Sequence, residues 1–319
     1  MTTFSKPPTQ IKDQIRLLES RGIVVRDYNS AMKFLLHCNY YRFSGYALHF
    51  ENFDNKGNRA HSFRPGTSFE NIVELYEFDD RLRTILFDYI GHIEIAVRAF
   101  MCNIIALHTA NAHWHLDASL FENCFTAKSA SAQTGYTSEY DRFLNKLEGE
   151  ITRSKEVFIK SYNDKYRHPK HPPSWMVVEI MPMGNWSRLY QNLANHGLKK
   201  EIADYFKQTP KILQSWIHAL SVLRNHCAHH SRIWNRNFHI SPALIKKHKK
   251  MINTSSHSGQ NINCTKLVSF FIVMNKLLEI LERDKKFKTE IRNLFVEYKN
   301  VPIEKTGLNQ EILKELEYK

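Results

Sequence analysis

The sequence predicts an all-α protein, and three observations support this fold class. Glycine and proline are scarce, with 11 and 10 residues in a chain of 319, which favours long helices over a turn-rich β fold. Several segments place apolar residues three and four positions apart, the spacing of one helix face. No two alternating segments joined by a turn indicate a strand pair, so helices are expected to form the whole core.

The N-terminal part is predicted to contain two short helices followed by an aromatic block, at Ile11–Leu18, Tyr28–Cys38 and Asn39–Tyr46. Within the block, Gly45 is expected to permit a tight turn. Tyr41 and its neighbours are expected to pack in the core rather than to stack on RNA. The polar segment Glu51–Pro65 contains glycine and proline and is predicted to be a loop.

The clearest periodicity runs from Phe69 to Leu107 and predicts either one long helix or two helices with a kink near Gly91. Ser68 or Thr67 is expected to cap its N-terminus. Glu94 and Arg98 are four residues apart on this helix, a spacing at which opposite charges can pair. A structural brace between these two side chains is expected rather than a catalytic role.

The rest of the chain is predicted to be helical segments separated by loops at Thr126–Ser138 and Tyr166–Ser174 and near Asn253–Asn263. The predicted helices are Tyr140–Tyr162, Trp175–Leu193 with a break near Pro182, Lys199–Phe206, Lys211–Trp234, Cys264–Arg283 and Lys285–Lys299. Three parts are expected: an N-terminal extension at 1–66, a core at 67–240 and basic C-terminal helices at 241–319 that pack on the core.

The charge balance favours a polyanionic partner, because 45 Lys and Arg against 32 Asp and Glu leave a formal charge of +13. A basic surface with no specific partner is the alternative. The five cysteines show no ligand-like spacing and no secretory signal precedes them. No apolar run is judged long enough to cross a bilayer. A soluble bacterial cytoplasmic protein without cofactor is therefore expected.

The segment Arg224–His229 carries the chemistry that the sequence suggests. On a helical wheel Cys227 falls on the apolar face, whereas Arg224, Asn225 and His229 point away from it. Histidine moves protons near neutral pH, and the arginine fork fits phosphate oxygens. RNA cleavage by 2′-hydroxyl attack on the adjacent phosphate needs both groups. A polar helix surface without chemistry is the alternative.

Several neighbouring side chains are candidates for contact with RNA. They are basic or aromatic residues: His226, Arg232, Trp234, Arg236, Lys246 and Lys247. For Arg232 and Arg236 the alternative is to cap the C-terminus of a helix. His230 falls within the apolar arc and is expected to be packed. His226 and His230 have a spacing that suits zinc, but no Asp or Glu lies between residues 205 and 278 to complete a site. No metal is therefore expected.

Four blocks in order resemble the Abi-like (AbiD/AbiF) abortive-infection family, which belongs to the HEPN superfamily of helical ribonucleases. Leu223–Arg236 is similar to the family signature, and three earlier blocks match around Tyr40–Tyr46, Leu75–Arg98 and Pro173–Gly184. The resemblance covers about residues 30–240. It implies a HEPN-like helical bundle with additional N- and C-terminal helices and an Arg-x4-His site formed by Arg224 and His229, with Asn225 as the customary polar residue.

The resemblance also implies an activity: a metal-independent endoribonuclease toxin of antiphage defence, controlled in some relatives by a structured noncoding RNA. Because only one motif occurs, two chains are expected to complete a composite site as a homodimer. Two alternatives stay open at the level of sequence. One is a non-catalytic RNA-binding module, and the other is a protein-interaction component of a defence system.

Overall fold

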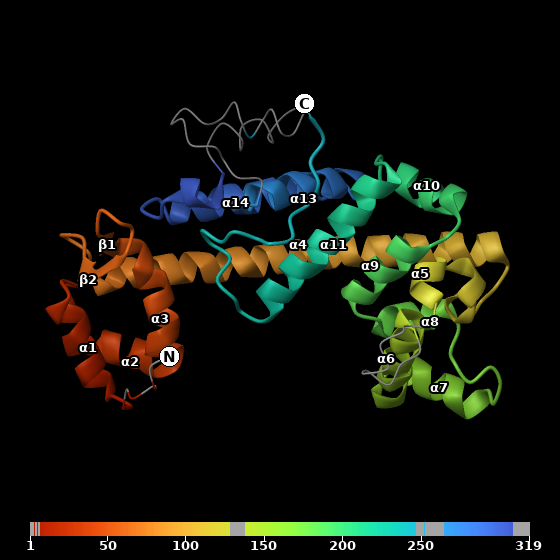
Figure 1. Cartoon of the computed structure of the whole chain (residues 1–319), viewed down its shortest axis with the longest axis horizontal. Helices are drawn as coiled ribbons and strands as arrows, with labels where there is room; N and C mark the ends of the chain where they lie inside the picture. The colour runs from red at the N-terminus through yellow and green to blue at the C-terminus, as the bar shows by residue number, and fades with distance from the viewer. Residues whose placement is uncertain are drawn as a thin grey trace. The chain divides into compact units, whose positions relative to one another are not determined.

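A computed structural model describes residues 3, 5, 7–127, 138–246, 252 and 265–308 of the chain. The described residues are overwhelmingly helical, which confirms the predicted all-α class (Figure 1). The chain divides into two compact units. The first comprises Met1–Leu82 with Asn293–Pro302, and the second comprises Arg83–Arg292 with Ile303–Lys319. The boundaries predicted at 66/67 and 240/241 stay predictions.

The first unit begins with helices α1 (Ile11–Ser20) and α2 (Tyr28–Cys38), as predicted. The aromatic block forms a third helix, α3 (Tyr40–Ala47), so the turn expected at Gly45 is wrong: this glycine lies within a helix. Asn39 starts the helix, because its side chain accepts a hydrogen bond from the backbone N–H of Tyr41 at 2.8 Å. Tyr41 itself is 87% exposed, so its expected packing is also wrong.

A small antiparallel hairpin occupies most of the segment that was predicted to be a loop. Strands β1 (Glu51–Phe53) and β2 (Arg59–Phe63) pair with Phe53 opposite Arg59. Asp54 organises the turn by accepting backbone hydrogen bonds from Lys56 and Asn58 at 2.8 and 2.7 Å. The strand pair was not predictable from the sequence because even the longer strand has only five residues. That is too few for a clear alternation of polar and apolar side chains.

An aromatic cluster fills the core of the first unit. The ring of Phe43 stacks on Phe69 at a centroid distance of 4.5 Å, and Phe34 packs edge-on against Tyr76 at 5.3 Å. Within this core, the hydroxyl of Tyr46 donates a hydrogen bond of 2.8 Å to the carboxylate of Asp79, which is fully buried. The block at Tyr40 therefore contributes to the core through Phe43 and Tyr46 rather than through Tyr41.

Helix α4 (Phe69–Thr109) is unbroken through Gly91, which resolves the alternatives in favour of one long helix. Ser68 caps it as predicted, because its hydroxyl accepts a hydrogen bond from the backbone N–H of Asn71 at 3.2 Å. By length and composition alone this helix could cross a membrane, contrary to the expectation that no run is long enough. Core helices of soluble proteins can have the same length and composition.

The second unit contains most of the remaining helices. They are α5 (Asn123–Thr126), α6 (Glu139–Arg153), α7 (Val157–Lys165), α8 (Ser174–Ile180), α9 (Met183–Asn192), α10 (His196–Tyr205), α11 (Pro210–Ala228), α13 (Val268–Ile280) and α14 (Asp284–Glu297), the last of which ends in the first unit.

The predicted break near Pro182 is confirmed between α8 and α9. The single helix predicted over Tyr140–Tyr162 is wrong. Ser154 interrupts it, with its hydroxyl bonded to the backbone N–H of Glu156 at 3.3 Å.

Residues 128–137 of the predicted loop Thr126–Ser138, and all of the predicted loop Asn253–Asn263, lie outside the described residues.

A buried histidine lies in the short turn Trp114–Leu116. His115 is 1% exposed, and its ring centroid is 6.2 Å from that of His113 and 6.3 Å from that of His171. Neither ring nitrogen of His115 has a hydrogen-bond partner among the described residues. Burial, aided by the nearby His171 and His113, lowers the pKa of His115 to about 3.

Candidate functional site

Helix α11 carries the predicted site, and its sequence explains where it starts and which face it buries. The hydroxyl of Thr209 accepts a hydrogen bond from the backbone N–H of Ile212, and Pro210 occupies the first turn, where no N–H is needed. Trp216, Leu220, Leu223 and Cys227 are buried as the wheel predicts. This face packs against α9, α10 and α13 (Figure 1).

The helix ends at Ala228, six residues before the predicted end at Trp234. The backbone N–H of His229 still bonds to the carbonyl of Asn225 at 2.9 Å, so His229 stays one turn above Asn225. The next residue leaves the helix, because His230 adopts a φ of 52°. His230 is consequently exposed, and the prediction that it packs in the core is wrong.

The three residues predicted to carry the chemistry reach the surface at this end of α11. Asn225 and His229 are exposed, and the side chain of Arg224 is 37% exposed. No hydrogen bond of the Asn225 or His229 side chain to another described residue is present. All three groups are therefore accessible to a ligand that approaches from solvent.

Two residues of α4 support Arg224. The Nε atom of Arg224 lies 3.7 Å from Oε2 of Glu94, and its guanidinium lies over the ring of Phe87 at 5.4 Å from the centroid. The pairing expected between Glu94 and Arg98 is not the contact observed. Arg98 instead donates a hydrogen bond of 2.8 Å to Glu179 on α8. Each arginine therefore pairs with a different carboxylate: Arg224 with Glu94, and Arg98 with Glu179.

His226 lies beside this surface and is half-buried. Its ring packs edge-on against Phe238 at a centroid distance of 5.8 Å. Burial lowers its pKa, and electrostatic interactions with Arg236 and then His229 lower it further. At neutral pH His226 therefore favours the uncharged form, which can bond to RNA only as a neutral imidazole.

The other candidates for RNA contact differ in accessibility. Arg236 lies over Phe238 at 6.0 Å and donates a hydrogen bond to the carbonyl of Arg232 at 3.2 Å; both arginines are partly exposed. Trp234 is fully buried, so the prediction that its ring contacts RNA does not fit its position. Lys246 is exposed, and Lys247 lies outside the described residues.

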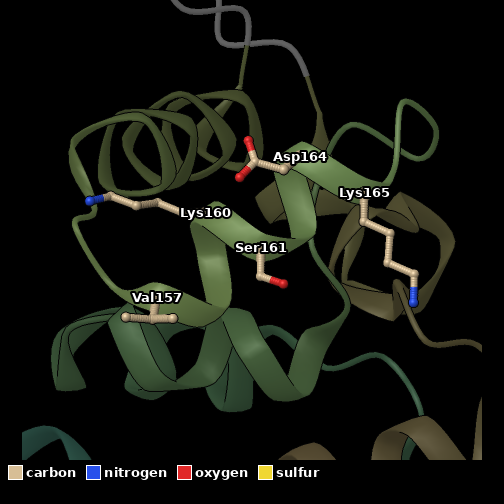
Figure 2. Close-up of a pocket in the computed structure, with 5 residues that line it drawn as sticks. All are labelled: Val157, Lys160, Ser161, Asp164 and Lys165. Atoms are coloured by element: carbon tan, nitrogen blue, oxygen red, sulfur yellow. The ribbon is translucent and has the colours of Figure 1, made fainter.

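No group of three or more metal-ligating side chains that could hold an ion occurs in the described part of the chain. A shallow hollow of about 420 Å³ is lined by five residues of α7 alone, and Figure 2 shows these side chains projecting in different directions from one helix. They are Val157, Lys160, Ser161, Asp164 and Lys165. The hollow includes none of the predicted site residues, so it does not bear on the chemistry at α11.

Fold and site together define a class: a basic, all-α protein with an exposed arginine–asparagine–histidine surface at the end of a core helix. The chain belongs to the Abi-like protein family, whose model matches residues 33–235. Membership implies a part in abortive-infection defence. No curated protein and no solved structure matches the chain.

Proposed function

We propose that this chain is a metal-independent endoribonuclease of the HEPN type that acts as the toxin of an antiphage abortive-infection system. The observation that carries the proposal is the exposed end of α11, where Arg224, Asn225 and His229 share one surface in the segment covered by the family match. The formal charge of +13 suits an RNA substrate. A structured noncoding RNA is proposed as its regulator, and the bacterial cytoplasm as its location.

The proposed reaction uses the chain's own side chains. The 2′-oxygen of a ribose attacks the adjacent phosphorus, the bond to the 5′-oxygen breaks, and a 2′,3′-cyclic phosphate and a 5′-hydroxyl form. One histidine takes the proton of the 2′-hydroxyl, and one returns a proton to the leaving oxygen. Arg224 stabilises the negative charge of the phosphorane. Asn225 orients the phosphate by hydrogen bonding.

The decisive experiment is incubation of the purified chain with single-stranded RNA in EDTA. The expected products end in 2′,3′-cyclic phosphate, which mass spectrometry identifies. Equal cleavage by the wild-type, Arg224→Ala and His229→Ala chains would refute the proposal. RNA binding without cleavage, weakened by changes at Lys and Arg and by salt, would instead favour the non-catalytic RNA-binding module.

A homodimer is part of the proposal, because one chain supplies one histidine of this motif whereas the reaction uses a base and an acid. Excess His229→Ala protein should therefore inhibit the wild-type chain. When subunits exchange freely, about a ninefold excess leaves about one wild-type chain in ten with a wild-type partner, so activity per wild-type chain should fall about tenfold. Fluorescent RNA cleavage after co-refolding measures this loss. Activity that stays constant would show that one protomer is sufficient.

A further inference from the structure

The contacts of Arg224 are distributed unevenly over its guanidinium. Glu94 lies beside the Nε edge, 3.7 Å from that nitrogen, and Phe87 covers one flat face. Nε is the guanidinium nitrogen of the ion pair with Glu94, and no hydrogen bond of the Arg224 side chain to another described residue is present. The guanidinium fork has a fixed planar geometry, so holding its Nε edge also fixes the direction of its Nη edge.

Both supporting residues are on α4, seven positions apart, which is about two helical turns. They therefore lie on the same face of a helix that is continuous through this region. The Glu94 side chain is only 12% exposed, which limits the positions that its carboxylate can take. A rigid element thus presents a carboxylate and an aromatic ring to one long, otherwise flexible side chain.

The charges around Glu94 explain why its carboxylate pairs with Arg224 rather than with Arg98. Burial raises the pKa of Glu94, and the positive charges of Arg224 and then Arg98 oppose this rise. Arg98 is itself held by Glu179, whose Oε2 lies 2.8 Å from Nη2 of Arg98. Glu179 therefore occupies Arg98 and leaves the carboxylate of Glu94 for Arg224.

We propose that Glu94 is a positioning residue that holds the Nε edge of Arg224, so that the Nη edge faces the scissile phosphate. This inference rests on the proposed ribonuclease function and assigns its substrate contact to a particular edge of one arginine. A flexible arginine would have to be ordered during the reaction, whereas a held arginine is already oriented for the developing charge. Glu94 does not touch the RNA in this arrangement.

The first test is the Glu94→Gln variant, which keeps the size of the side chain and removes its charge. The expected result is a fall in kcat of about 10- to 100-fold with a smaller change in KM, because the contact acts on orientation in the transition state. Glu94→Asp, which keeps the charge on a shorter stem, should recover part of the loss. Glu150→Gln on α6, which removes a carboxylate 2.8 Å from Arg153, is the matched control and should retain wild-type rates.

A second readout does not depend on cleavage. The Nε–H resonance of Arg224, identified by its disappearance in Arg224→Ala, should shift in Glu94→Gln and stay in place in Glu150→Gln. An unshifted resonance would overturn the inference while leaving the proposed function intact, and so would a shifted resonance with unchanged kcat. If the wild-type chain does not cleave RNA and the resonance still shifts, the ribonuclease proposal and the assigned catalytic role fail, while the Glu94–Arg224 contact stands.

Discussion

The His229→Ala chain is expected to cleave RNA about 100- to 10,000-fold more slowly than the wild-type chain, because a side chain that moves a proton in the transition state contributes about that factor. His229 is exposed one turn above Asn225, where such a proton transfer is sterically open. The fall should appear in the rate constant of the cleavage step, measured in single-turnover assays with excess protein. The variant should still fold, because His229 lies outside the core.

The Arg224→Ala chain should lose about 100- to 1,000-fold in kcat, the range seen when one charge-stabilising donor is removed from an active site. His218→Ala serves as the control for both variants, because His218 is an exposed histidine on the same helix and outside the candidate site. Comparable activity of His229→Ala and His218→Ala would show that the motif is not catalytic.

Acid is expected to destabilise this protein as the pH falls below about 6.5, because of His115. The pKa of His115 is lowered to about 3 by burial, whereas an unfolded histidine titrates near the ordinary 6.5. Between these values the unfolded chain binds more protons than the folded chain, so stability falls as the pH falls below 6.5. This histidine should cost about 2 kcal/mol of unfolding free energy by pH 5.

The measurement is the free energy of unfolding in urea at pH 7 and pH 5. The His115→Phe variant keeps a planar ring and removes the titration, so its stability should fall less than that of the wild-type chain over this interval. His239→Phe, at an exposed histidine, should behave like the wild-type chain. The same pH-dependent loss in all three proteins would show that His115 does not control acid stability.

The sequence predicted the helices whose apolar faces are regular, and it failed where a few residues decide a boundary. The stripe through Trp216, Leu220 and Leu223 identified α11 and its buried side. Its end at Ala228 had no glycine or proline to mark it, because a histidine adopts the positive φ that closes the helix. The same local uncertainty explains the helix around Gly45, a residue whose flexibility suggested a turn.

The candidate site was predictable in its components but not in its support. Arg224, Asn225 and His229 follow from helical spacing, which is a local property of the sequence. The contact between Glu94 and Arg224 joins residues 94 and 224, and only the packing of α4 against α11 reveals it. Spacing instead favoured Arg98 as the partner of Glu94. His115 was missed because nothing in its neighbours distinguishes a buried histidine from an exposed one.

The end of α11 also bears on how the length of this motif can vary. His229 takes its place at the boundary between helix and turn, whereas Arg224 and Asn225 lie inside the helix. An extra residue between Ala228 and His229 would lengthen the turn and leave the two helical residues in register. An extra residue before Asn225 would rotate everything that follows by about 100°. An insertion after Ala228 should therefore move His229 alone, whereas one between Arg224 and Asn225 should also turn Asn225 away from Arg224.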